Sequence, residues 1–305
     1  MNQGGQISLR VPVTPMVRKI MLANLGIYLL TALSALLMTA PTLRQWVDNL
    51  WLTHPSVTER GKVWTVATYA WFHDLGRGGL DGQRFLPLMS VLMCTAAGYG
   101  IYRLYNSAWS RREFFLFLLV AFVIIQFVSI AGYGAPLHLA GNLMGLYFFG
   151  HIFEERWGSR RFIYFWIICT VGGGVFSTLA YQFFPSMVGD GPVLGASAGV
   201  LGLVAAFSIY FPEQQVLFGL LVPIKAKHFL WIAVAFDLLA LIAGSNVAVF
   251  AHFGGMIAAA LLCTGYWRPA KIMGKFSSGK TKNSHLRLVL PDDDDDDDKP
   301  RRYLH

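Results

Sequence analysis

The chain alternates long apolar runs with short polar segments. The first run, Ile20–Ala40, carries no charged residue and is long enough to cross a bilayer, which takes about 20 residues. We interpret it as a retained span and not as a signal peptide, because its apolar core is too long and no small-x-small cleavage site follows it. The further runs without Asp, Glu, Lys or Arg, apart from Asp237, are Phe85–Tyr102, Phe114–Phe153, Phe162–Gly189, Gly191–Pro212 and Phe229–Trp267.

Two of these runs are too long for one helix, and each contains a break. Phe114–Phe153 is interrupted by GYGAP at 132–136, and Phe229–Trp267 by GSN at 244–246. Glycine and proline in such clusters mark turns. The pattern therefore predicts an all-α, polytopic membrane protein with about eight transmembrane helices, at residues 20–40, 85–102, 114–131, 138–153, 161–184, 197–211, 229–243 and 248–267.

Composition and charge support a membrane protein. Hydrophobic residues make up 55% of the chain and charged residues 14%, whereas soluble domains have about 25% charged residues. A net charge of +8 is compatible with nucleic-acid binding, but in a membrane protein it more often reflects basic loops on the cytoplasmic side. We therefore expect the lipid bilayer as a partner, and no nucleic acid.

The basic residues also orient the predicted helices. With the N-terminus inside, the basic loops fall on the inner side, and the outside keeps basic residues only in one long loop. We therefore expect an integral, multi-pass protein of the bacterial inner (plasma) membrane with both termini in the cytoplasm. The inner basic residues are Arg10, Arg18, Lys19, Arg103, Arg111, Arg112, Arg156, Arg160, Arg161, Lys225 and Lys227.

This topology divides the chain into three segments. Residues 1–19 form a cytoplasmic N-terminal segment, residues 20–267 the membrane domain, and residues 268–305 a cytoplasmic tail. The tail contains the aspartate run Asp292–Asp298, whose charges repel one another. We therefore expect the tail to be disordered.

A few polar residues stand inside the apolar runs, where each needs a partner or a function. His138 and Asn142 are four residues apart, which places them on one face of a helix. Ser197 and His252 lie near the starts of two other predicted helices, toward the same outer side. Small residues of the kind that let helices approach closely lie beside both. They are Gly195, Ala196, Ala198, Gly199 and Gly202, and Gly254, Gly255, Ala258 and Ala259.

This arrangement indicates a serine nucleophile. A hydroxyl attacks poorly unless a base removes its proton, and His252 is the candidate base for Ser197. Attack on an amide creates an oxyanion, for which His138, Asn142 and the backbone N–H of Ser197 are candidate donors. The predicted helix 197–211 rises roughly 22 Å against a bilayer core of about 30 Å, so we expect its start in an aqueous pocket below the outer surface. The chain has no H-E-x-x-H pair and no glycine-rich phosphate loop, so we expect neither a metal nor a nucleotide cofactor.

Five segments resemble the rhomboid intramembrane serine proteases. They are WTVATYAWFH (Trp64–His73), HLAGNLMGLYFFG (His138–Gly150), EERWGSRRF (Glu154–Phe162), GASAGVLG (Gly195–Gly202) and AHFGG (Ala251–Gly255). The resemblance implies a six-helix rhomboid-like core and a Ser–His dyad, with Ser197 as nucleophile and His252 as base. It also implies His138 and Asn142 as oxyanion stabilisers. Asp237 lies on the preceding antiparallel helix at a depth close to that of His252, which makes it a candidate third member. Because the family works as a dyad, we interpret Asp237 as structural.

The chain departs from the family pattern most in an insertion at 74–134. This segment separates the motifs at His73 and His138, which lie only a few residues apart in the family, and it contains the predicted helices 85–102 and 114–131. We favour a transmembrane hairpin, because two added crossings preserve the downstream topology. The alternative is a re-entrant pair in the outer leaflet.

The residues and the resemblance together predict an intramembrane serine endopeptidase that cuts transmembrane substrates near the outer membrane boundary. Because a peptide bond inside a helix is shielded, its substrates should carry a helix-weakening transmembrane segment. The alternative is a catalytically silent rhomboid-like protein that binds or escorts membrane clients. A transporter or channel would spread polar residues along a path across the bilayer, whereas here they are confined to one side.

Overall fold

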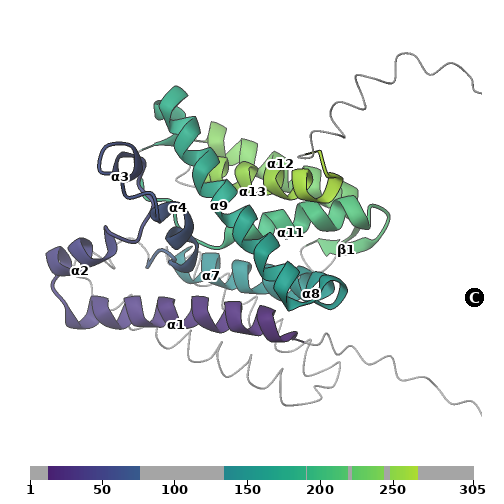
Figure 1. Ribbon diagram of the computed structural model, residues 1–305, viewed down its shortest axis with the longest axis horizontal. Coiled ribbons are helices and arrows are strands. Elements are labelled where there is room, and N and C mark those ends of the chain that lie inside the picture. Colours follow the sequence, from purple (N-terminus) through teal and green to yellow (C-terminus); the bar gives the residue numbers. More distant parts are fainter. Residues whose placement is uncertain (1–12, 76–133, 190, 219–221, 244–247, 267–305) are drawn as a thin grey trace, which may run out of the picture. The chain divides into compact units, whose positions relative to one another are not determined.

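The computed structural model describes residues 13–75, 134–189, 191–218, 222–243 and 248–266, and most of them are helical (Figure 1). The first part of the chain forms α1 (Pro15–Leu37), α2 (Ala40–Val47), α3 (His54–Thr58), α4 (Thr65–Thr68) and the 3-10 helix η1 (Tyr69–Trp71). The later part forms α7 (Gly134–Gly145), the π-helical turn η2 (Leu146–Gly150), α8 (His151–Trp157), α9 (Ser159–Phe183), α10 (Pro185–Val188), α11 (Ser197–Tyr210), β1 (Gln215–Phe218), β2 (Val222–Lys225), α12 (Ala226–Ile242) and α13 (Val249–Thr264).

The long helices predicted on described residues are all present, with shifted ends. α1 begins at Pro15, five residues before the predicted start, and its first turns include Arg18 and Lys19. Proline is favoured at the first position of a helix. α1 ends at Leu37, after which Met38 is extended. The predicted helices 85–102 and 114–131, and nearly all of the insertion, lie outside the described residues. The hairpin therefore stays a prediction.

The all-α expectation is wrong in one place. Between α11 and α12, β1 and β2 pair as a two-stranded antiparallel hairpin, with Val216 opposite Ile224. β-branched residues such as Val216, Val222 and Ile224 favour strands. The hairpin was not predicted because it lies between the apolar runs 191–212 and 229–267, from which the helices were predicted. The short helices α2, α3, α4 and α10 were not predicted either.

Glu154 fixes the start of α1 against the corner between α8 and α9. Its carboxylate accepts hydrogen bonds from the backbone N–H groups of Met16 and Val17, both at 2.8 Å, and from the hydroxyls of Thr14 and Ser159, both at 2.5 Å. The first N–H groups of a helix have no partner within it, so the carboxylate satisfies donors that would otherwise be orphaned. Burial raises the pKa of Glu154, but the hydrogen bonds outweigh burial and hold the pKa below its ordinary value.

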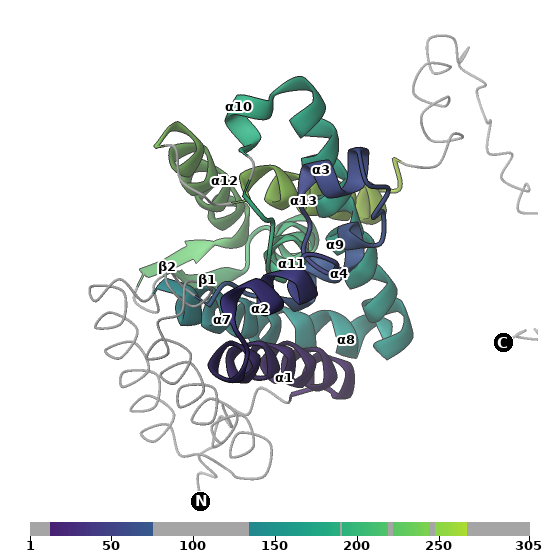
Figure 2. The ribbon, with the colours of Figure 1, turned by 90° about the vertical axis from the view of Figure 1, so that its left-hand side faces the viewer.

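α11 lies at the centre of the described helices, with α7, α9, α12 and α13 around it (Figure 2). All but four of its residues are buried, and its sequence is apolar on every side, as expected for a helix without a solvent face. A helix so enclosed is a fixed platform for a side chain at its end.

Glycines bring α9, α11 and α13 into unusually close contact. A Cβ added at Gly255 of α13 would collide with the carbonyl oxygen of Ala198 in α11. A Cβ at Gly254 would lie 2.5 Å from the carbonyl oxygen of Gly172, and one at Gly173 would lie 2.7 Å from that of Ala251. The close approach predicted for the small residues of α11 and α13 is therefore confirmed, and α9 joins it.

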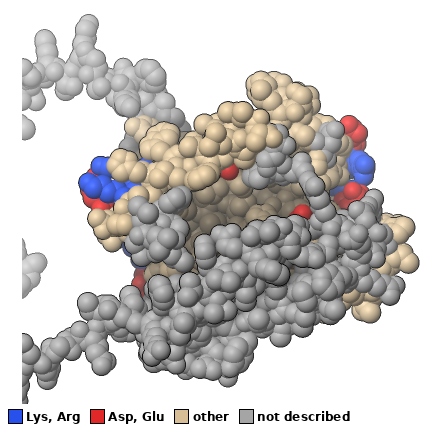
Figure 3. Space-filling view, turned by 180° about the vertical axis from the view of Figure 1, so that it is seen from behind, with Lys and Arg blue, Asp and Glu red and all other residues tan. Residues whose placement is uncertain are grey.

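On the face that Figure 3 shows, the charged side chains of the described residues gather at the left and right edges, and mostly uncharged residues lie between them. Two described helices, α1 and α9, are long and apolar enough to cross a bilayer, and α11 and α13 are shorter apolar helices. The total of about eight crossings stays a prediction. The compact unit that contains these helices ends at Gly265, and the predicted division at 1–19, 20–267 and 268–305 is otherwise untested.

Candidate functional site

Ser197 is the first residue of α11, as predicted. Two residues earlier, Gly195 has a φ of +105°, a conformation that residues with a Cβ rarely adopt. A Cβ at Gly195 would also collide with the ring of His138. The turn that presents Ser197 thus depends on glycine for two independent reasons. Ser197 is half-buried, whereas Ala196 and Ala198 on either side of it are buried, so its hydroxyl is the accessible group of this turn.

His252 lies in the first turn of α13, and its ring reaches Ser197. The distance from His252 Nε2 to Ser197 Oγ is 2.8 Å, which is a hydrogen bond. The contact depends on the glycine packing just below it, because any side chain at Gly255 would push α13 away from Ala198. The structure therefore brings together the two residues that the sequence singled out as nucleophile and base.

Asp237 of α12 contacts the opposite side of the same ring. The distance from His252 Nδ1 to Asp237 Oδ1 is 2.8 Å, and both side chains are buried. The sequence placed Asp237 at a depth close to that of His252 and considered it as a third member of the site, but interpreted it as structural. The structure brings the two side chains into direct contact.

His138 and Asn142 lie on α7, and His138 faces the turn before Ser197. The His138 ring packs against Gly195, and the Asn142 amide nitrogen lies 3.1 Å from Nε2 of His73. His73 was part of a motif but not a predicted site residue. Its ring centroid lies 5.2 Å from that of His138, so two histidines and an amide form one polar cluster beside the serine turn.

The protonation of His73 follows from its surroundings. Burial, and then the nearby His138, lower the pKa of His73 to about 3, so the ring is neutral at ordinary pH. The Asn142 amide nitrogen can only donate, so His73 Nε2 accepts and His73 Nδ1 carries the proton. One of the two amide protons of Asn142 is thereby committed to His73.

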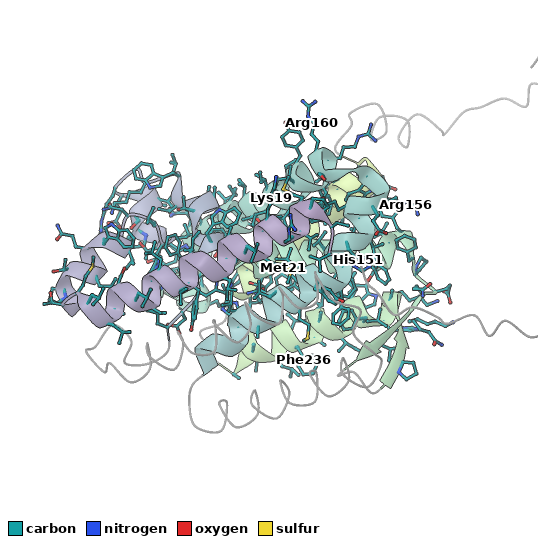
Figure 4. All side chains as sticks on the ribbon, turned by 90° about the horizontal axis from the view of Figure 1, so that it is seen from below. Lys19, Met21, His151, Arg156, Arg160 and Phe236 are labelled. Atoms are coloured by element: carbon teal, nitrogen blue, oxygen red, sulfur yellow. The ribbon has the colours of Figure 1, made fainter. Side chains whose placement is uncertain are left out.

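The serine end of α11 lies opposite the basic end of the bundle. Lys19, Arg156 and Arg160, from α1, α8 and α9, lie toward one end (Figure 4). Lys225 and Lys227, which follow α11 in the chain, pair there with Glu213 and lower the pKa of that carboxyl to about 2. α11 rises about 21 Å over its 14 residues, which is shorter than a bilayer core of about 30 Å. Its serine end therefore fits a position below the far surface of the membrane.

An apolar cavity of about 750 Å³ lies between α7–α8, α11 and α12. It reaches along α11 to Leu201, one helical turn from Ser197. The described residues that line it are largely apolar and aromatic, and they include Gly145, Phe149, Leu201, Val204, Phe229 and Ala233.

Ser197 and His252 meet where α11 and α13 are in close contact, inside the helix bundle. This arrangement is that of a helical protein with a serine–histidine site among its helices. Residues 123–269 match the family model described as Rhomboid domain. Just under half of the chain therefore matches the rhomboid domain, which agrees with the family that the sequence motifs predicted.

Two curated relatives agree with this family. RHOMBOID-like protein 12, mitochondrial, of Arabidopsis thaliana is 28% identical over 136 residues, which are 41% of this chain and 40% of that protein. Rhomboid protein 1, mitochondrial, of Saccharomyces cerevisiae is 31% identical over 80 residues, which are 26% of this chain and 23% of that protein. The chain thus aligns with less than half the length of either relative.

The names of these relatives contradict the predicted location. Both are mitochondrial proteins, so the expectation of a bacterial inner membrane with cytoplasmic termini is wrong. The physical reason is that basic loops indicate which side of a membrane a segment faces, but not which membrane it is.

Proposed function

We propose that the chain is a rhomboid-type serine endopeptidase that cuts transmembrane substrates within a mitochondrial membrane. The observation that carries the proposal is the 2.8 Å contact between His252 Nε2 and Ser197 Oγ. A base at this distance is placed to take the hydroxyl proton as the oxygen attacks. The mitochondrial location is inferred from the names of the two relatives.

The proposed reaction has two steps. Ser197 Oγ bonds to the scissile carbonyl carbon while its proton passes to His252 Nε2, and the carbonyl π electrons move to the oxygen. The tetrahedral intermediate then expels the amine, which takes the proton from Nε2, and an acyl-enzyme remains. In the second step, a water molecule gives a proton to His252 Nε2 and attacks the acyl-enzyme. The carboxylic acid leaves, and Ser197 Oγ takes the proton back from Nε2. The unpaired N–H groups at the start of α11, Asn142 and His138 are the proposed oxyanion donors.

The surroundings of the site support a substrate that comes from the membrane. The apolar cavity ends one turn from Ser197 and has room for bulky apolar side chains. A helix must unwind locally before its peptide bond can meet the serine, so a substrate with a helix-weakening segment is proposed. No specific observation favours the alternative, a silent relative that only binds membrane clients.

The test is cleavage of a model single-span substrate in liposomes by wild-type protein and Ser197→Ala. The proposal expects Ser197→Ala to lose essentially all cleavage. Ser208→Ala is the matched control, because Ser208 lies on the same helix but hydrogen-bonds only to backbone carbonyls, those of Val204 and Ala226. Undiminished cleavage by Ser197→Ala would show that Ser197 is not the nucleophile.

A further inference from the structure

We propose that Asp237 is a positioning residue that completes a Ser197–His252–Asp237 triad across three helices. The inference rests on the proposed function, because it assigns a role within that same site. It goes beyond the dyad, which needs only the serine and the histidine.

The geometry gives Asp237 a defined effect on the ring. A carboxylate oxygen only accepts, so the 2.8 Å contact requires His252 Nδ1 to carry the proton. Nε2 of the neutral ring then has a free lone pair, and Ser197 donates its hydroxyl proton to it across 2.8 Å. Asp237 thus selects the tautomer in which His252 can act as a base.

The position of Asp237 on α12 shows that the contact is specific. Asp237 and Ala226 are the buried residues of this helix, whereas the neighbours Phe236 and Leu238 are 58% and 44% exposed. Phe236 lies on the outer side of α12 (Figure 4). An otherwise lipid-compatible helix therefore directs its one carboxylate inward, at the imidazole.

A purely structural link between α12 and α13 does not account for a carboxylate here. Oδ2 of Asp237 is buried and has no hydrogen-bond partner among the described residues, and a charged group with an unsatisfied oxygen is costly inside a membrane protein. A neutral amide would link the helices at lower cost. A negative charge becomes useful when His252 takes the serine proton and turns cationic, because the carboxylate then stabilises the ion pair.

The other groups packed around His252 do not replace this effect. α11 offers the Ser197 hydroxyl, and α9 presents Gly172 and Gly173 to α13. α7 contributes His138, whose ring is close enough to interact electrostatically with His252 but packs on Gly195. Among these described neighbours, Asp237 is the one acidic group in contact with the ring.

The experiment compares Asp237→Asn, Asp237→Glu and wild type in the liposome cleavage assay, with thermal unfolding of each. Asparagine keeps the volume of the side chain but can donate to Nδ1, which favours the wrong tautomer. We expect Asp237→Asn to lower kcat about 10²-fold or more, with KM and the unfolding temperature close to wild type. Asp237→Glu should recover part of the loss. Leu238→Ala, a neighbour on the exposed side, is the matched control and should stay near wild type.

Three results would count against the inference or its basis, and they differ. Wild-type kcat in Asp237→Asn would show that the dyad suffices and would overturn the triad. A loss of kcat that accompanies a matching drop in unfolding temperature, unrescued by glutamate, would assign Asp237 a structural link instead. Cleavage that persists in Ser197→Ala would reject the proposed function itself.

Discussion

α13 and α12 both supply a side chain to the site, but they are held in opposite ways. α13 packs against α9 and α11 with backbone against backbone, through Gly254 and Gly255. α12 fully buries only Ala226 and Asp237, and exposes large apolar side chains such as those of Trp231, Leu239 and Ile242. Within a membrane, helices gain little from the hydrophobic effect and associate through close packing and hydrogen bonds. The imidazole is therefore positioned by backbone packing, whereas the carboxylate is positioned by its hydrogen bond.

The largest effect is expected from a side chain in the tight contact. Gly255→Val should lower the free energy of unfolding by about 3 kcal/mol and abolish cleavage, because the added carbons collide with the Ala198 carbonyl and separate the two helices. Unfolding in SDS and the cleavage assay measure both effects. Gly26→Ala is the control, since a Cβ at Gly26 meets nothing within 4 Å. Equal stability of the two variants would contradict the role of the close contact.

The next effect is expected at the corner that holds α1. Glu154→Ala should lower the free energy of unfolding by about 2 to 3 kcal/mol, because the N–H groups of Met16 and Val17 lose their acceptor. SDS unfolding measures it. The exposed neighbour Glu155 provides the control, and Glu155→Ala should change the unfolding free energy by less than about 0.5 kcal/mol. Similar values for the two variants would show that the cap contributes little.

An effect of similar size is expected from acid. His73 is neutral in the folded chain, with a pKa of about 3, whereas the unfolded chain has the ordinary value near 6.5. Between these two values the unfolded state binds more protons, so stability is full above about pH 6.5 and falls as the pH drops toward 3. Glu154, whose pKa is also lowered, adds a loss in the same direction. Thermal unfolding from pH 7 to pH 4 measures the fall, and His73→Gln should make it less steep; an unchanged slope would contradict the neutral, buried ring.

The smallest effect is expected on the exposed face of α12. Leu239 is 60% exposed, and Leu239→Ala should change the free energy of unfolding by less than about 0.5 kcal/mol. SDS unfolding of Leu239→Ala and Gly255→Val compares the loss of unfolding free energy in α12 with that in α13. A cost at Leu239 as large as that at Gly255 would show that α12 is packed as tightly as α13.

Sequence reasoning located the site better than its surroundings. The starts of α11 and α13 and their close contact followed from residue types along the chain, because clustered small residues let two apolar helices approach closely. The glycines of α9 at 172–174 carried the same signal but were not used. The depth of Asp237 near His252 followed from the antiparallel order of the helices, but the contacts of His73 with Asn142 and His138 depend on how segments distant in sequence dock. The family motifs gave the family correctly, but the charge pattern gave the wrong membrane.

Activation of Ser197 by His252 can be tested directly by labelling with a fluorophosphonate probe, followed by mass spectrometry of the modified peptide. We predict a single adduct on Ser197 of the wild-type protein, and none in Ser197→Ala or His252→Ala. An absence of labelling in the folded wild-type protein, or an adduct that persists in His252→Ala at the wild-type rate, would contradict the claim that the imidazole activates this hydroxyl.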